Sequence, residues 1–162
     1  MNRAWDSPLR PVEVDVIDAD ARERLEAIAR SMNLGGNERH VLVCAMQTTP
    51  RCCSREAGVE VWEYLKRRVK ELGLDSPPPA WRGRREGPPP ETPTGQGRLL
   101  RSKVDCLRVC EQGPIAVVYP EGIWYAGVTC EVMERILREH VLQGQPVHEH
   151  AFAVAPLEPL PE

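Results

Sequence analysis

The sequence predicts an α/β fold in which a small mixed sheet is flanked by helices. Four segments of the chain have the length and apolar content of β-strands. Two longer segments carry apolar residues at helical spacing, and Gly and Pro residues separate them from the strands. Read along the chain, the order of the core is strand, helix, strand, strand, strand, helix.

The strand segments are short and bounded by turns. Val41 to Val43 is a brief apolar run, and residues 99 to 104 form a second candidate. A Gly-Pro turn then introduces the continuous apolar run 115 to 119. The turn at 120 to 122 returns the chain as 123 to 125, so we expect a β-hairpin there.

The two core helices are amphipathic. The first has one apolar face that ends at Gly73, made of Val59, Trp62, Leu65, Val69 and Leu72. The second begins after Thr129, a favourable N-cap, and ends at Gly144. Its inward positions are Val132, Met133, Ile136 and Leu137.

Outside this core we expect an N-terminal helical extension, a Pro-rich loop insertion and a short tail. The extension covers 1–38 and contains a helix from Asp18 to Met32 whose narrow apolar face should dock on the main domain. The main domain covers 39–155 and is interrupted at 76–97, where seven of the sixteen prolines lie. Residues 156–162 form the tail, and we expect the last ten residues to be frayed.

Composition excludes several classes of protein. The net charge of −3 argues against nucleic-acid binding by bulk charge. No apolar stretch approaches the roughly 18 residues that a membrane span needs. The first residues resemble no secretory signal, so we expect a cytoplasmic protein.

Charge is spread unevenly along the chain. Residues 38–108 carry 14 basic and 9 acidic residues. This basic excess either attracts an acidic protein partner or only balances the acidic ends of the chain.

The six cysteines carry the functional signal. Cys44 ends the first strand, Cys52 and Cys53 are adjacent in the following loop, and Cys106 and Cys110 lie in a turn-like stretch before the third strand. In a reducing compartment such clusters hold metal more often than they form disulfides. The first pair is separated by seven or eight residues, which is long for a zinc knuckle, and the second by three, so an iron–sulfur cluster is favoured and zinc stays the alternative. Neither loop contains a Cys-x-x-Cys motif or the two histidines of a Rieske centre.

The segments HVLVC, CC and VWEYLK, followed by CLRVCEQGPIAVVYPEGIWYAGVT, resemble the thioredoxin-like [2Fe–2S] ferredoxins and, more distantly, a flavoprotein subunit of respiratory Complex I. This resemblance implies a thioredoxin-like fold and one-electron transfer by a [2Fe–2S] cluster. It implies Cys44, Cys53, Cys106 and Cys110 as ligands, with Cys52 as the alternative to Cys53. It also implies a redox partner protein and a homodimer.

The resemblance leaves one functional alternative and one cysteine open. The N-terminal helix and the Pro-rich loop depart from the compact ferredoxins, so an iron–sulfur sensor or an assembly subunit of a larger oxidoreductase is the alternative. We expect no enzyme activity, because no nucleophile–base pair and no phosphate loop is visible.

Cys130 begins a helix, where a thiol is either reactive or, as we favour, inert. The histidines at 140, 148 and 150 are expected at the surface.

Overall fold

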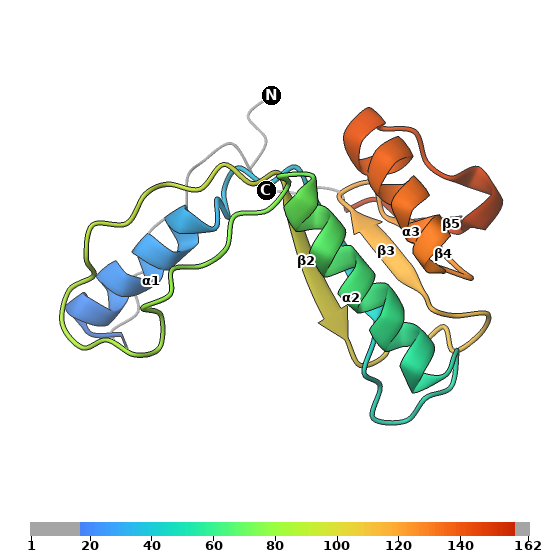
Figure 1. The fold of residues 1–162 in the computed structure, drawn as a ribbon, viewed down its shortest axis with the longest axis horizontal. Coiled ribbons are helices and arrows are strands. Elements are labelled where there is room, and N and C mark those ends of the chain that lie inside the picture. The colour runs from blue at the N-terminus through green and yellow to red at the C-terminus, as the bar shows by residue number, and fades with distance from the viewer. Residues whose placement is uncertain (1–16, 158–162) are drawn as a thin grey trace. The chain divides into compact units, whose positions relative to one another are not determined.

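A five-stranded mixed sheet forms the centre of the fold in the computed structural model, which describes residues 17–157 (Figure 1). The strand order is β2-β1-β3-β4-β5. The strands are β1 (Arg39–Cys44), β2 (Leu99–Val104), β3 (Ala116–Tyr119), β4 (Ile123–Tyr125) and β5 (Ala151–Val154). β1 pairs in parallel with β2, and the remaining pairs are antiparallel. This confirms the small mixed sheet predicted from sequence.

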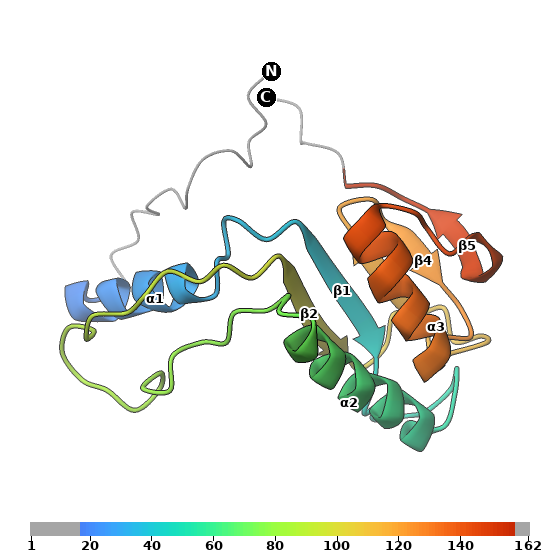
Figure 2. The same cartoon turned by 45° about the horizontal axis from the view of Figure 1, so that its top comes forward.

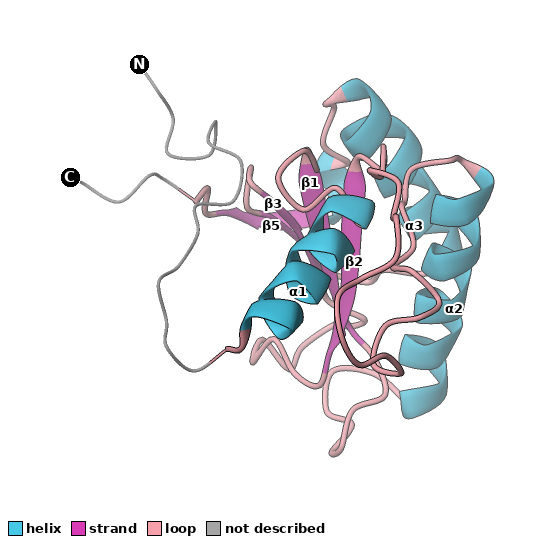
Figure 3. Cartoon of the chain, turned by 90° about the vertical axis from the view of Figure 1, so that its left-hand side faces the viewer, coloured by secondary structure: helices cyan, strands magenta, loops and turns pink. Residues whose placement is uncertain are grey.

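Two helices cover one face of this sheet (Figures 2 and 3). They are α2 (Arg55–Glu71) and α3 (Cys130–Arg135), and α3 continues into a π-helical turn over Ile136–Val141. Ser54 and Thr129 cap them, as each side chain accepts a hydrogen bond from a backbone N–H three residues on. The buried core between helices and sheet includes Val41, Leu65, Val118, Met133 and Leu137. None of the helices in the described part of the chain has the length and apolar content of a membrane span.

The helix α1 (Ala19–Ser31) packs with the Pro-rich segment to form a separate unit, residues 17–37 and 74–98 of the described chain. As expected, residues 76–97 contain neither helix nor strand. Gly95 N donates to Arg30 O at 3.0 Å, and Asn33 Nδ2 donates to Gly97 O at 2.8 Å. A Cβ on Gly95 would lie 2.0 Å from Ser31 O, so only glycine permits this approach. The residues that α1 buries are Ala27 and Ser31, whereas Leu25 of the predicted apolar face is 52 % exposed.

Two sequence expectations were wrong. The end of the chain was expected to be frayed, yet β5 adds an edge strand and pairs with β4. His140 was expected at the surface, yet it is 1 % exposed. Its Nδ1 lies 2.9 Å from the Tyr125 hydroxyl, so each of these buried groups has a hydrogen-bond partner there. His140 Nε2 lies 3.7 Å from the Glu121 carboxylate, beyond hydrogen-bond distance. Most of the predicted tail, 158–162, lies outside the described residues.

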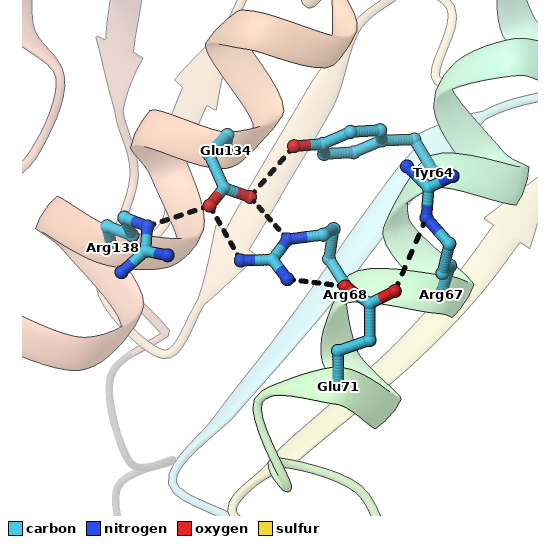
Figure 4. Close-up of polar contacts among 6 residues, drawn as sticks. All are labelled: Tyr64, Arg67, Arg68, Glu71, Glu134 and Arg138. Carbon is cyan, nitrogen blue, oxygen red and sulfur yellow. Dashed lines mark hydrogen bonds and ion pairs between the residues drawn. The ribbon is translucent and has the colours of Figure 1, made fainter.

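A cluster of polar and charged side chains, centred on Glu134, joins α2 to α3 (Figure 4). Glu134 accepts hydrogen bonds from Tyr64 Oη at 2.9 Å, from Arg68 Nε at 2.8 Å and from Arg138 Nε at 2.7 Å. A second bond from Arg68 Nη2, at 2.8 Å, makes the Arg68 contact bidentate. These bonds, led by those from Arg68, lower the pKa of Glu134 to about 2.

We expect Glu134→Gln to lower stability by about 2 kcal/mol at pH 7, because charged hydrogen bonds are lost from three donors. For a chain of this size that corresponds to a Tm roughly 4–8 °C lower. The carboxylate stabilises the fold above its unfolded pKa near 4.5, and this contribution disappears as the pH falls toward 2. Thermal unfolding at pH 7 and pH 3 measures both effects. If the Tm difference between the wild type and Glu134→Gln were the same at pH 7 and pH 3, the electrostatic origin would be contradicted.

Candidate metal centre

The parallel pairing of β1 and β2 brings two cysteine loops to one edge of the sheet. Cys44 is the last residue of β1 and pairs in register with Val104, the last residue of β2. Chain segments that follow neighbouring parallel strands leave the sheet at the same edge. The loop with Cys52 and Cys53 therefore meets the loop with Cys106 and Cys110. A hydrogen bond from Thr48 N to the Asp105 carboxylate ties the two loops together.

The thiols at this edge lie in pairs. Cys106 Sγ and Cys110 Sγ are 3.7 Å apart. Burial raises the pKa of the Cys44 thiol most, and the Cys52 and Cys106 thiols raise this pKa further. Cys52 also influences Cys110 electrostatically. All six cysteines of the chain are free thiols, so none of these groups is committed to a disulfide.

Cys53 has different surroundings. Gln47 Nε2 lies 3.3 Å from Cys53 Sγ, and Cys53 directly precedes Ser54, the N-cap of α2. Its neighbouring thiol is Cys52, at 3.9 Å. Cys53 thus faces the start of α2, whereas Cys52 faces the other loop.

Backbone N–H groups of the second loop point at sulfur. Leu107 N donates to Cys44 Sγ at 3.2 Å, and Arg108 N donates to Cys106 Sγ at 3.1 Å. Arg108, Cys110 and Gln112 have φ values of 66°, 52° and 50°, a left-handed conformation that is strained for side-chain-bearing residues. Alternating left-handed residues form concavities lined by N–H groups, which favour negatively charged ligands. The loop is therefore shaped to stabilise thiolates.

Gly113 permits a close approach to Cys52. Its N–H donates to Cys52 O at 2.8 Å. A Cβ added at Gly113 would lie 2.5 Å from Cys52 Sγ, well inside van der Waals contact. The position of the Cys52 thiol therefore depends on the absence of a side chain at residue 113.

No protein-family model matches this chain. A candidate 2Fe-2S ferredoxin of Priestia megaterium is 32 % identical over 112 residues, which cover 69 % of this chain and 68 % of the relative. The chain belongs to the [2Fe–2S] ferredoxin family. A 2Fe-2S ferredoxin of Aquifex aeolicus is 27 % identical over 116 residues, covering 67 % of this chain and 84 % of the relative.

Solved structures confirm the fold of this ferredoxin. A thioredoxin-like [2Fe-2S] ferredoxin from Aquifex aeolicus superposes with a TM-score of 0.53 at 21 % identity, covering 75 % of this chain and 96 % of the other. The thioredoxin-like fold expected from the sequence resemblance is thereby confirmed. The relatives favour an electron carrier over the sensor or assembly-subunit hypothesis.

The thiol arrangement of this ferredoxin fits a cluster of two irons. Among residues 17–157, no three His, Cys, Asp or Glu side chains converge closely enough for a single metal ion. The thiols instead form pairs, and a [2Fe–2S] cluster takes two protein ligands on each iron. The N–H groups of Leu107 and Arg108 suit the negative charge of such a cluster. The pairs therefore match a two-iron cluster better than one zinc ion.

Three of the four predicted site residues, Cys44, Cys106 and Cys110, lie at the same sheet edge, where Leu107 N donates to Cys44 Sγ and the other two thiols are 3.7 Å apart. Their role as ligands stays a prediction. The choice of Cys53 as the fourth stays a prediction, and the neighbours of Cys52 make it the competing residue. Sequence reasoning missed Gln47, a buried amide whose only sequence signal is its position between two cysteines. Cys130 lies elsewhere, with its Sγ 3.9 Å from Glu60 O, and burial raises the pKa of its thiol. A raised pKa agrees with the inert thiol that we favoured.

Burial also makes Cys44 the least reactive of these thiols before the cluster is loaded. Cys44 is 2 % exposed, and desolvation raises the pKa of its thiol to about 11. At pH 8 its thiolate fraction should be roughly 200-fold below that of an ordinary cysteine, whose pKa is about 8.5. We expect iodoacetamide to modify Cys44 last in the cluster-free protein, and faster as the pH rises to 11. Peptide mapping by mass spectrometry measures this, and equal rates in the native and urea-unfolded chain would contradict it.

Proposed function

We propose that this ferredoxin is a one-electron carrier whose [2Fe–2S] cluster is held by Cys44, Cys106, Cys110 and one cysteine of the adjacent pair. The main support is the meeting of paired thiols at one sheet edge, where N–H groups donate to two sulfurs. When bound, the cluster accepts and releases one electron. The chain would perform no substrate chemistry of its own.

The surroundings of the thiols differ in a way that suits electron transfer. Cys44 is buried, and its sulfur accepts a backbone hydrogen bond, which stabilises negative charge away from solvent. Cys106 is exposed and lines an open pocket together with Cys110, Arg51 and Arg108. A partner can therefore approach one thiol pair closely while the protein shields the other.

A redox partner protein would dock transiently over this pocket. Arg51 and Arg108 flank it and Asp105 lies within it, so the local charge is mixed. Six free thiols support a reducing, cytoplasmic location.

A homodimer is supported by the edge strand β5, where Phe152 and Val154 are 49 % and 68 % exposed. Sedimentation of the wild type and of Phe152→Lys tests the dimer, since the charge should yield a monomer.

The test of the function is the visible spectrum of anaerobically purified protein, with iron and sulfide assays. We expect absorption bands that bleach with dithionite and return on oxidation, and about two irons and two sulfides per chain. Reversible cycling with little loss of absorbance is the behaviour of a carrier. A colourless protein after anaerobic reconstitution with iron and sulfide would refute the proposal.

A further inference from the structure

Resting on the proposed function, we propose that Gln47 is a positioning residue for electron transfer, whose buried side-chain amide donates to the Cys53 sulfur and raises the reduction potential of the cluster. The observation is a glutamine buried in the loop between β1 and α2, with its amide nitrogen beside a thiol. Gln47 supplies no ligand. It acts through Cys53, taken here as the fourth ligand in agreement with the sequence spacing.

The amide nitrogen of Gln47 lies nearer to one of the two adjacent thiols. Gln47 Nε2 is 3.3 Å from Cys53 Sγ and 3.9 Å from Cys52 Sγ. A thiolate carries lone pairs and no proton, so it accepts a hydrogen bond from an amide N–H and is repelled by an amide oxygen. The orientation of the Gln47 side chain therefore suits a negatively charged sulfur at Cys53.

The other end of the same amide has no partner. Gln47 is 2 % exposed, and its Oε1 accepts no hydrogen bond from any residue between 17 and 157. Burial of an amide with one unpaired polar atom costs free energy, which an apolar side chain of similar size would avoid. The contact of the amide nitrogen with sulfur is therefore the interaction that accounts for a glutamine at this position.

The start of α2 holds the amide in place. Arg55 Nη1 donates to Gln47 O at 2.6 Å, which fixes the backbone of this residue. Gly58 lies in the first turn of α2, where a Cβ would be only 3.1 Å from both Gln47 Oε1 and Cys44 O. Glycine disfavours a helix, but here it lets the helix approach the buried amide. The donor is thus preorganised and needs no rearrangement when the charge on the sulfur changes.

A hydrogen bond to a ligand sulfur affects the two oxidation states unequally. Reduction adds one electron, so the reduced state carries one more negative charge than the oxidised state. A fixed N–H donor stabilises the more negative state more, and hydrogen bonds to sulfur are among the features that set the potential of an iron–sulfur protein. The amide of Gln47 should therefore make this ferredoxin easier to reduce.

The test is a redox titration of Gln47→Leu, with Gln112→Leu as the control, followed by visible absorbance. Gln112 is an exposed glutamine of the second cysteine loop and bonds only weakly to Glu111, at 3.4 Å. In Gln47→Leu we expect the equilibrium to shift at least ~3-fold toward the oxidised form, about 30 mV for one electron. The control should keep the wild-type potential. An unchanged or more positive potential in Gln47→Leu would overturn the proposal.

Thermal unfolding of the cluster-free chain separates this role from a structural one. Without the cluster the amide meets a neutral thiol and keeps an unpartnered oxygen, so Gln47→Leu should unfold at the wild-type Tm or above it. A lower Tm together with an unchanged potential would assign Gln47 to folding alone and overturn the proposal.

Gln47→Asn is a second variant that keeps the amide but shortens the side chain by one methylene. Its nitrogen is withdrawn from Cys53, so we expect a shift in potential in the same direction as in Gln47→Leu. Loss of the cluster from both variants would show that Gln47 is needed for loading and not for setting the potential, and would overturn the proposal. A colourless wild type would instead refute the proposed function, so the two failures are distinguishable.

Discussion

Cys106→Ala and Cys110→Ala should each purify without the visible absorption of an iron–sulfur cluster. These residues form the thiol pair with a 3.7 Å separation and would together hold one iron in the proposed ligand set. Either alanine would then remove one of the four thiolates that the cluster needs. We expect iron to fall from about two per chain to near zero.

The control for this prediction is Cys130→Ala. Cys130 starts α3, and its sulfur lies near Glu60 O, away from the two cysteine loops. This variant should keep the spectrum and the iron and sulfide content of the wild type. A full visible spectrum in Cys106→Ala would contradict the ligand assignment, and loss of the cluster in Cys130→Ala would show that cysteine removal acts through folding instead.

Gly113→Ala should also prevent stable cluster binding, although residue 113 supplies no ligand. The new Cβ would lie 2.5 Å from Cys52 Sγ and 2.8 Å from Cys52 Cβ, so the thiol or the loop must move. The fourth ligand of the proposed set is Cys52 or its neighbour Cys53, and a displacement of this pair by about 1 Å is enough to weaken a preorganised site. We expect at least a ~10-fold faster loss of visible absorbance in the presence of an iron chelator, in line with the effect of altered surroundings on metal affinity.

Gly35→Ala is the matched control, because a Cβ at Gly35 meets no atom within 4 Å. It should bleach at the wild-type rate. Circular dichroism of both variants separates a local effect from unfolding. Wild-type bleaching of Gly113→Ala would mean that the Cys52 thiol does not occupy this position in the loaded protein.

Most of the secondary structure could be predicted because it depends on local signals. The apolar stripe ending at Leu72 and the Ser54 cap define α2, and the turn at Gly122 defines the β3–β4 hairpin. The residues that were mispredicted depend on distant partners. β5 exists because β4 offers it an unpaired edge, and His140 is buried because Tyr125, fifteen residues earlier, provides a hydrogen-bond partner.

The same division applies to the candidate site. The spacing of Cys44, Cys106 and Cys110 and the motifs around them were enough to indicate the family and its cluster. Cys52 and Cys53 could not be separated by spacing, since either residue can be reached by a shift of one position in a loop. Their surroundings differ because Gln47 lies beside Cys53 and Gly113 beside Cys52, and these neighbours depend on the folded loops. Local patterns along the chain therefore specify which chemistry this ferredoxin carries, whereas contacts made on folding set the surroundings of each thiol, because a sulfur's neighbours depend on packing.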